Sequence, residues 1–271
     1  MPSRSRSASM LKVSDLTEVY TAGFLQRESA VAVDGVNFAV QEGETVSLVG
    51  ESGSGKTTTA HIILRLLPPT SGEVVFEGRD IWAFKTKKEL KGYWRKVHGI
   101  FQDPYAAFNP IYKADRILYQ VFNLVDRDVG DKRKLVREAL EAVKLRPEEV
   151  LGRYSHQLSG GQRQRMMVAR CYLLKPQMIV ADEPVSMVDA SGRAGILKLF
   201  LELRDLYGTA VIFITHDLGL AYYMSHRILV MHKGKIVEEG TPEKILSDPQ
   251  HPYSRKLIAD IPLIRRKWED I

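Results

Sequence analysis

The sequence predicts an α/β fold with a mostly parallel β-sheet and a helical subdomain inserted between its two halves. Three observations support this fold class. A short apolar run at residues 45–49 leads directly into a Gly-rich loop and a helical pattern. After residue 165, strand-like and helix-like segments alternate, as they do in parallel sheets. Between these parts, residues 84–165 are rich in charged side chains and carry apolar residues at helical spacing.

The first half of the chain predicts three strands and one helix. Alternating side chains at residues 36–40 indicate a half-buried strand, and the apolar residues 45–49 indicate a buried one. Residues 57–67 carry apolar side chains on one side, so we expect a helix that ends before Pro68. Residues 73–78 indicate another short strand.

The second half continues the alternation of strands and helices. Residues 178–181 and 210–215 are predicted strands, and residues 194–204 are a predicted helix between them. Residues 228–237 are expected to form a β-hairpin that turns near Gly234. No internal repeat is visible, so the chain carries one unit of this kind.

The composition is that of an ordinary globular protein. Of the 271 residues, 44% are hydrophobic, and no apolar run approaches the roughly 20 residues needed to span a bilayer. If the protein works on a membrane, another chain must span it. The net charge of +6 is spread in short clusters, which favours solvated faces over a surface for nucleic acid or anionic lipid.

The cysteine content and the first residues of the chain indicate the kind of cellular compartment in which the protein works. The single cysteine, Cys171, cannot form an internal disulfide, which fits a reducing environment. Its neighbours indicate a helix in which it is a small buried residue. Residues 1–9 are rich in Ser and Arg and lack the apolar stretch of a signal peptide, so we expect a disordered tail there.

Residues 50–57 match the phosphate-binding pattern G-x-x-x-x-G-K-[ST] in full. The glycines permit backbone dihedrals that aim successive N–H groups at one point, and the following helix N-terminus adds to this anion site. Lys56 would reach the β- and γ-phosphates, and the Thr57 hydroxyl would bind Mg²⁺. The predicted ATP-binding residues here are Gly50, Ser52, Gly53, Ser54, Gly55, Lys56, Thr57 and Thr58.

Two further segments suit phosphate chemistry. Asp182 ends an apolar strand, at the edge where α/β sheets bind ligands, and there it would help hold Mg²⁺. Alone, Asp-Glu-Pro after a strand is more often a surface strand end, but the upstream loop overturns that interpretation. Residues 158–162, Leu-Ser-Gly-Gly-Gln, precede a helical pattern and would place a hydroxyl and free N–H groups at a helix N-terminus.

Together these motifs, in this order, resemble those of the ABC ATPases. The Leu-Ser-Gly-Gly-Gln segment, followed by a strand that ends in Asp-Glu, is the most specific part of the likeness. The resemblance implies a P-loop NTPase (RecA-like) core with an antiparallel β subdomain and an inserted α-helical subdomain. It also implies an ABC ATPase domain at residues 10–247, with the helical subdomain at about 84–165.

The resemblance assigns catalytic roles to residues that would be uninformative alone. Glu183, after the magnesium-binding Asp182, would position and deprotonate the attacking water. His216 would contact the γ-phosphate. Gln102 would contact Mg²⁺ or the water and sense a transport partner. The implied catalytic set is Glu183, His216, Gln102 and Lys56, and the implied magnesium ligands are Thr57, Gln102 and Asp182.

In ABC ATPases the signature segment acts on ATP held by a second ATPase domain, so the chain is expected to dimerise. The residues that would act in trans are Ser159, Gly160, Gly161 and Gln162. Asp189 matches the aspartate at the dimer interface, although Ser-Met-Val-Asp departs from the commoner Ser-Ala-Leu-Asp. For the aromatic side chain that stacks on adenine we choose Tyr20, with Phe24 as the rival.

Local phrases resemble the oligopeptide and dipeptide importer ATPases. These are residues 32–36, Gln-Asp-Pro-Tyr at 102–105, Phe-Asn-Pro at 108–110, and His-Pro-Tyr-Ser at 251–254 followed by Ile-Pro at 261–262. This resemblance implies a C-terminal extension at residues 248–271. Some family members hold an iron–sulfur cluster in that extension with cysteines, which are absent here, so we expect no cluster.

The same resemblance implies a setting for the chain. ATP and Mg²⁺ would be its cofactors, and it would sit peripherally on the cytoplasmic face of the cell membrane. Its partners would be two transmembrane permease subunits, a second and often non-identical ATPase subunit, and an extracytoplasmic solute-binding protein, with no nucleic acid. Residues 103–111 would meet the coupling helices of the membrane subunits.

Three alternatives remain open at this point. Some relatives of this kind import oligosaccharides in place of peptides. An ABC ATPase that acts on nucleic acid or ribosomes usually shows zinc cysteines, a long coiled coil or two cassettes, none of which the sequence contains. A subunit that binds ATP without turnover is disfavoured because Glu183 and His216 are both present.

Overall fold

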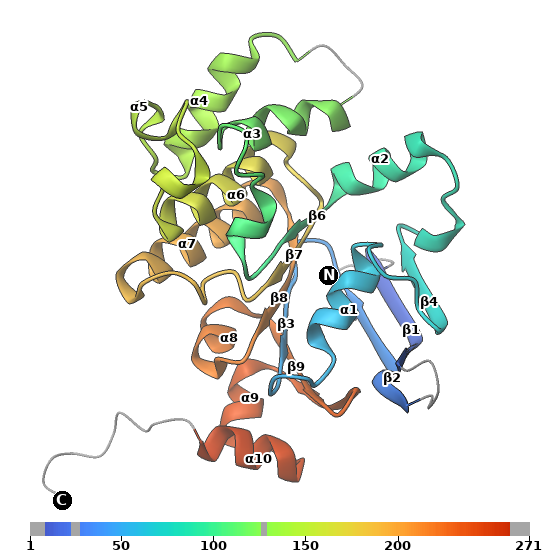
Figure 1. Cartoon of the computed structure of the whole chain (residues 1–271). Helices are drawn as coiled ribbons and strands as arrows, with labels where there is room; N and C mark the ends of the chain where they lie inside the picture. Colours follow the sequence, from blue (N-terminus) through green and yellow to red (C-terminus); the bar gives the residue numbers. More distant parts are fainter. Residues whose placement is uncertain (1–8, 23–27, 126–128, 261–271) are drawn as a thin grey trace, which may run out of the picture.

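A six-stranded sheet forms the centre of the protein in the computed structural model, which describes residues 9–22, 28–125 and 129–260 (Figure 1). The strand order is β10-β9-β3-β8-β7-β6, and all neighbours are parallel except the β9–β10 pair at one edge. The strands are β3 (Thr45–Val49), β6 (Val97–Ile100), β7 (Met178–Asp182), β8 (Ala210–Thr215), β9 (Arg227–His232) and β10 (Lys235–Gly240). Every residue of β3, β7 and β8 is buried, which explains their continuous apolar runs.

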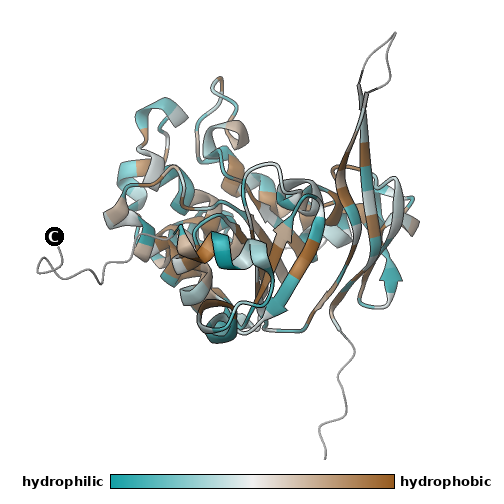
Figure 2. Ribbon diagram, turned by 90° about the horizontal axis from the view of Figure 1, so that it is seen from below, coloured by the Kyte–Doolittle hydropathy of each residue, from teal (hydrophilic) through white to brown (hydrophobic). Residues whose placement is uncertain are grey.

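An antiparallel sheet lies on the side of the molecule opposite to most of the helices (Figure 2). Its order is β2-β1-β4-β5, with strands β1 (Leu11–Ala22), β2 (Glu28–Val40), β4 (Ser71–Phe76) and β5 (Arg79–Asp80). The antiparallel β subdomain that the sequence predicts is therefore present. Strand β1 was not predicted, because Asp15 has a φ of 48° and the β1–β2 register shifts three times, which breaks the period-two pattern.

Helices cover both faces of the central sheet. Helix α1 (Lys56–Ile63) packs between the two sheets, where its apolar side chains meet Leu48, Val180 and Ile212. On the other face, Ile179, Val211 and Phe213 meet helices α6 (Gly160–Leu174) and α7 (Ala190–Tyr207). Successive residues of one strand thus serve different layers, as the alternation of side chains along a strand requires.

The helical region between β6 and β7 differs from its prediction at residues 84–165. Helix α2 (Lys87–Lys96) packs Tyr93 against Phe76 of the antiparallel sheet, with ring centroids 5.6 Å apart. Strand β6 follows and pairs with β7 in the central sheet. The helical region therefore begins after Ile100, with η2 (Pro104–Ala107), α3 (Arg116–Gln120), η3 (Val121–Leu124), α4 (Lys132–Ala142), α5 (Pro147–Val150) and η4 (Ser155–Gln157). The short 3₁₀ turn η1 (Ile81–Ala83) precedes α2.

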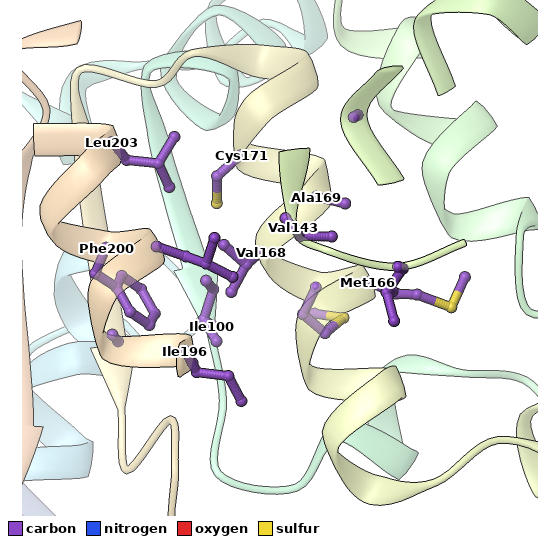
Figure 3. Close-up of a cluster of buried hydrophobic side chains, with 14 of the residues drawn as sticks. Ile100, Val143, Met166, Val168, Ala169, Cys171, Ile196, Phe200 and Leu203 are labelled. Atoms are coloured by element: carbon purple, nitrogen blue, oxygen red, sulfur yellow. The ribbon is translucent and has the colours of Figure 1, made fainter. Parts of the chain in front are cut away.

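One hydrophobic cluster joins the helical region to the central sheet. Figure 3 shows Val143 of the helical region and Ile100 of β6 close to side chains of α6 and α7. Cys171 lies in this cluster and is completely buried, as the sequence predicts. Burial raises the pKa of the Cys171 thiol to about 12, so the thiol stays protonated and unreactive at neutral pH.

Element boundaries follow the sequence predictions in some places and depart from them in others. Strand β8 and the β9–β10 hairpin, which turns at Lys233 and Gly234, lie where the sequence places them. Helix α1 ends at Ile63, four residues earlier than expected, because Arg65 takes a left-handed φ of 58°. Helix α7 extends the predicted 194–204 at both ends, from its cap at Asp189 to Gly208.

The C-terminal helices α9 (Pro242–Ser247) and α10 (Pro252–Ala259) pack beside α8 (Leu218–Met224) and β9. A small cluster of buried side chains joins these elements: Val49, Leu218, Ala221, Ile228, Val230, Ile245 and Tyr253. None of the helices in the described parts of the chain is long and apolar enough to cross a bilayer. Most of the predicted N-terminal tail, residues 1–8, and the end of the predicted C-terminal extension, residues 261–271, lie outside the described residues.

Candidate nucleotide site

Apart from the signature segment, the predicted phosphate-handling residues meet at one edge of the central sheet. Strands β3, β6, β7 and β8 are parallel, so their carboxyl ends lie together, and each leads into one of the motifs. They surround a cavity of about 440 Å³. Its lining is Tyr20, Ala32, Ser52, Gly53, Gly55, Lys56, Thr57, Thr58, Gln102, Asp182, Glu183 and His216. The structure thus brings together residues from six separate stretches of the sequence.

The Gly-rich loop holds its own lysine. Lys56 Nζ donates hydrogen bonds to Gly50 O at 2.8 Å, to Glu51 O at 2.7 Å and to Ser54 Oγ at 3.2 Å. Gly50 and Ser54 shape the loop but are not among the described residues that line the cavity. A Cβ atom on Gly50 would lie 2.1 Å from Met231 O, so only glycine allows the loop this close to strand β9.

Burial and charge act against each other at the base of the cavity. Lys56 is 7% exposed, and burial lowers the pKa of its ammonium group, while the charges of Glu183, Asp182 and Glu51 oppose that shift. Burial raises the pKa of Asp182, which is 4% exposed, and a hydrogen bond from Thr57 opposes it. Asp182 Oδ1 is buried without a hydrogen-bond partner among the described residues. Such an oxygen beside a threonine hydroxyl fits a hard divalent cation.

Glu183 is held in an unusual backbone conformation. Its φ of 48° lies in the left-handed region, which is costly for a residue with a side chain and is concentrated at functional sites. The Glu183 N–H donates to Ile214 O of β8 at 2.9 Å. Its carboxylate atom Oε1 accepts a hydrogen bond from the His216 N–H at 2.9 Å and lies 2.6 Å from His216 Nδ1. The turn after β7 therefore directs the carboxylate to the end of β8.

Tyr20, the aromatic residue predicted to stack on adenine, also lies at the cavity. Tyr20 is half-exposed on β1, and its hydroxyl lies 3.4 Å from Thr58 Oγ1. Gln102 follows β6 and is exposed at the cavity wall. The rival Phe24 lies outside the described residues. Ala32 also lines the cavity, although in the sequence it is only part of the family-like stretch 32–36 and carries no signal of a site residue.

The signature segment lies apart from this cavity. Ser159 caps helix α6: its hydroxyl accepts from Gln162 N at 3.1 Å, and Gln162 Oε1 accepts from Ser159 N at 2.9 Å. A Cβ atom on Gly160 would lie 3.0 Å from Met187 O, so the segment packs against the stretch before Asp189. Ser159 and Asp189 are exposed, and neither Asp189 nor any signature residue lines the described cavity.

A second and larger cavity, of about 670 Å³, lies elsewhere. It opens between α4 and the C-terminal ends of α6 and α7, and its lining includes Leu135, Tyr172 and Tyr207. None of the predicted site residues is among the described residues that line it. The predicted catalytic and phosphate-binding residues therefore line the smaller, more polar cavity.

A phosphate-binding loop, a buried aspartate and a paired glutamate and histidine at the carboxyl edge of a parallel sheet define a P-loop nucleoside triphosphatase. A family model described as "ABC transporter" matches residues 33–186, more than half of the chain. The chain belongs to the ABC transporter family, and it is an ATPase of the ATP-binding cassette type. The fold class predicted from the sequence is thereby confirmed.

Individual relatives and structures agree with this family. The chain is 42% identical over 262 residues to a probable peptide ABC transporter ATP-binding protein of Sinorhizobium fredii, covering 95% of this chain and 74% of the relative. It is also 42% identical to the oligopeptide transport ATP-binding protein OppF of Lactococcus lactis, covering 94% and 81%.

Solved structures of ATP-binding cassettes are similar across most of the chain. A dimeric post-hydrolysis structure of the cassette MJ0796, bound to ADP and phosphate, has a TM-score of 0.77 at 30% identity and covers 86% of this chain and 99% of that one. CbiO1 of Clostridium perfringens, part of a transporter complex, has a TM-score of 0.72 at 25% identity, with 94% and 96% covered.

Proposed function

We propose that this chain is the ATP-hydrolysing subunit of an importer for oligopeptides or dipeptides. The observation that carries the cargo class is the 42% identity, over almost the whole chain, to relatives named for peptide import. The cavity supports turnover and not mere nucleotide binding, because Lys56, Glu183 and His216 all line it. Its residues suit ATP as the substrate.

The proposed chemistry assigns each cavity residue a task. The loop around Lys56 would bind the β- and γ-phosphates, and Tyr20 would stack on adenine. Glu183 would position the attacking water and accept its proton, while His216 would hold the Glu183 carboxylate and contact the γ-phosphate. Gln102, at the cavity wall, would contact Mg²⁺ or the attacking water.

Mg²⁺ fits the polar groups beside the phosphate loop. Thr57, Asp182 and Gln102 all line the cavity, and the unpartnered, buried Asp182 Oδ1 is the acceptor that a cation would satisfy. When bound, Mg²⁺ would neutralise negative charge on the phosphates. No iron–sulfur cluster is proposed, because residues 248–271 contain no cysteine.

The separation of the signature segment from the cavity supports action in trans. Ser159, Gly160, Gly161 and Gln162 would complete the site of a second ATPase subunit, and Asp189 would lie at the interface between the two. Ser159 is exposed at a helix N-terminus, where its hydroxyl and nearby N–H groups suit an anion supplied by a partner. The partner would be a second copy or a non-identical relative.

The membrane partners would contact the surface formed by residues 103–111. Ile111 is 77% exposed, and Tyr105 is also exposed, beside a hollow of about 220 Å³ lined by Phe108 and Tyr112. Such apolar side chains suit helices of two permease subunits. The chain would then lie peripherally on the cytoplasmic face of the membrane, with a solute-binding protein on the other side and no nucleic acid.

Purification of the tagged full chain from its native membranes in mild detergent tests this function. Mass spectrometry should identify two permease subunits, an ATPase partner and a solute-binding protein, whose ligand is then determined with peptide and oligosaccharide libraries. A peptide ligand supports the cargo class, and an oligosaccharide ligand replaces it with the alternative. Recovery with ribosomes or nucleic acid, without membrane proteins, would overturn transport and leave the ATPase intact.

A further inference from the structure

The C-terminal helix reaches the phosphate-binding loop directly. Tyr253, in the first turn of α10, accepts a hydrogen bond at its hydroxyl from the Glu51 N–H at 2.9 Å. The two residues are 202 positions apart in the sequence. The Tyr253 ring also stacks on His232, the last residue of β9, with ring centroids 3.8 Å apart and an interplanar angle of 26°.

The hydrogen bond falls on a peptide unit that also contacts the phosphate-binding lysine. The Gly50 carbonyl and the Glu51 N–H belong to one planar peptide group. Lys56 Nζ donates to the Gly50 carbonyl at 2.8 Å, while the Glu51 N–H donates to Tyr253. This peptide is therefore held from both ends, and rotating it would break both hydrogen bonds. Hydrogen bonds linked through one peptide also polarise and strengthen each other.

Tyr253 is itself fixed by its surroundings. The side chain is 8% exposed and packs with Val49 and Val230 in the cluster under the C-terminal helices. The start of α10 is tied to β10 because Glu238 accepts from Gln250 N at 2.7 Å and from His251 N at 3.0 Å. A tyrosine placed this firmly loses little conformational freedom when it holds the loop.

We propose that Tyr253 is a positioning residue for ATP binding: its hydroxyl fixes the orientation of the Gly50–Glu51 peptide and, through that peptide, the place of Lys56. Tyr253 is not among the described residues that line the cavity, so it acts on the loop and not on the nucleotide. The C-terminal helix thereby becomes a structural part of the nucleotide site. This role concerns the ATPase itself and is independent of the cargo.

A role in packing alone predicts a different outcome from a role in positioning. Tyr253→Phe keeps the ring, its stack on His232 and its place in the cluster, and removes only the hydroxyl. If the hydroxyl positions the loop, the dissociation constant for ATP should rise about three- to tenfold, which corresponds to about 0.6–1.4 kcal/mol, the usual net value of a neutral hydrogen bond. If the residue only packs, nucleotide affinity should stay at the wild-type value.

The test compares full-length wild type, Tyr253→Phe and the control Tyr172→Phe by equilibrium titration with a fluorescent N-methylanthraniloyl derivative of ATP. The Tyr172 hydroxyl hydrogen-bonds Glu202 at 3.1 Å between α6 and α7, away from the nucleotide cavity. Weaker binding in Tyr253→Phe alone, with a melting temperature that falls no further than that of Tyr172→Phe, which also loses one hydrogen bond, supports the positioning role. In the assembled transporter, KM for ATP should rise while kcat changes less than twofold.

A dissociation constant for Tyr253→Phe within twofold of wild type would overturn the inference, and so would an equal loss in Tyr172→Phe. Should Tyr253→Phe fail to fold, His232→Gln provides the second test. This substitution removes the ring on which Tyr253 stacks but leaves the hydroxyl and the Glu51 N–H in place. A smaller loss of affinity in the same direction is expected, and unchanged affinity would contradict the role.

Discussion

The backbone N–H of His216 donates a hydrogen bond to Glu183 Oε1 at 2.9 Å, and its ring atom Nδ1 lies 2.6 Å from the same oxygen. One carboxylate oxygen is therefore held by two groups of a single residue that follows the neighbouring strand. Glu183 also has a left-handed φ of 48°, a backbone conformation that is concentrated at functional sites. A fixed carboxylate is what the proposed deprotonation of water requires.

Glu183→Gln should keep ATP binding and stop hydrolysis. Glutamine retains the size of the side chain but cannot accept a proton, so the rate should fall at least about 100-fold. Binding titration, phosphate release and size-exclusion chromatography with ATP would show retained affinity, lost turnover and a trapped dimer. The exposed Glu141 on α4 offers a matched control, Glu141→Gln, with unchanged turnover. Wild-type turnover in Glu183→Gln would refute the assignment of the base.

Lys56→Ala should lose most of its affinity for ATP. The substitution removes the ammonium group that meets the phosphates and also the three hydrogen bonds that shape the loop. An increase of the dissociation constant by at least tenfold is expected in equilibrium titration. Lys91→Ala, at an exposed lysine on α2, should bind as wild type does. Unchanged binding in Lys56→Ala would contradict the proposed phosphate contact.

Ser159→Arg should separate binding from turnover. Ser159 is exposed and does not line the described cavity of its own chain, so ATP binding by the monomer should be unaffected. The bulky side chain would block the surface that is proposed to meet a partner, and turnover should be lost. Because the substitution also removes the cap of α6, about 1 kcal/mol of stability should be lost, which denaturation measures separately. Weakened binding by the folded monomer would refute action in trans.

His98 on β6 should make the free energy of unfolding decrease as the pH is lowered from about 6.5 toward 3. Burial, assisted by the charge of Arg170, lowers the pKa of His98 to about 3. The unfolded chain has a histidine pKa of about 6.5, so between these values it binds more protons than the folded one. The stabilisation that the folded chain gains from neutral His98 is fully present above pH 6.5 and is lost as the pH falls toward 3.

At pH 5 the loss from His98 amounts to about 2 kcal/mol of the free energy of unfolding. His98→Gln removes the titrating group, so urea unfolding at pH 7 and pH 5 should show a smaller decrease for the variant than for wild type. Equal decreases in the two proteins would show that His98 titrates normally in the folded chain.

Local motifs made much of the nucleotide site predictable. The loop at residues 50–57 and the Asp182–Glu183 pair carry their chemistry in neighbouring residues, and each follows a strongly apolar strand. Their meeting at one edge follows from the parallel sheet that the alternating pattern predicts. The assignments of Tyr20, the signature residues and the magnesium ligands stay predictions until binding and turnover are measured.

Other features depend on contacts that a sequence pattern does not contain. Strand β6 has four residues, including His98 and Gly99, and it becomes a strand only through its pairing with β7. The bulged strand β1 lacks a regular period for a similar reason. The contact between Tyr253 and Glu51 joins positions 202 residues apart, so the sequence marks the His-Pro-Tyr segment as a family feature without giving its physical role.

The complete burial of the single cysteine gives this chain a practical advantage for spectroscopy. Cys171 presents no reactive sulfur at the surface, so it does not have to be replaced before a labelling site is introduced elsewhere. A cysteine introduced at the exposed Met187, beside the signature segment, would be the only thiol open to maleimide reagents. Fluorophores or spin labels there could follow the approach of two subunits through each cycle of nucleotide binding and release.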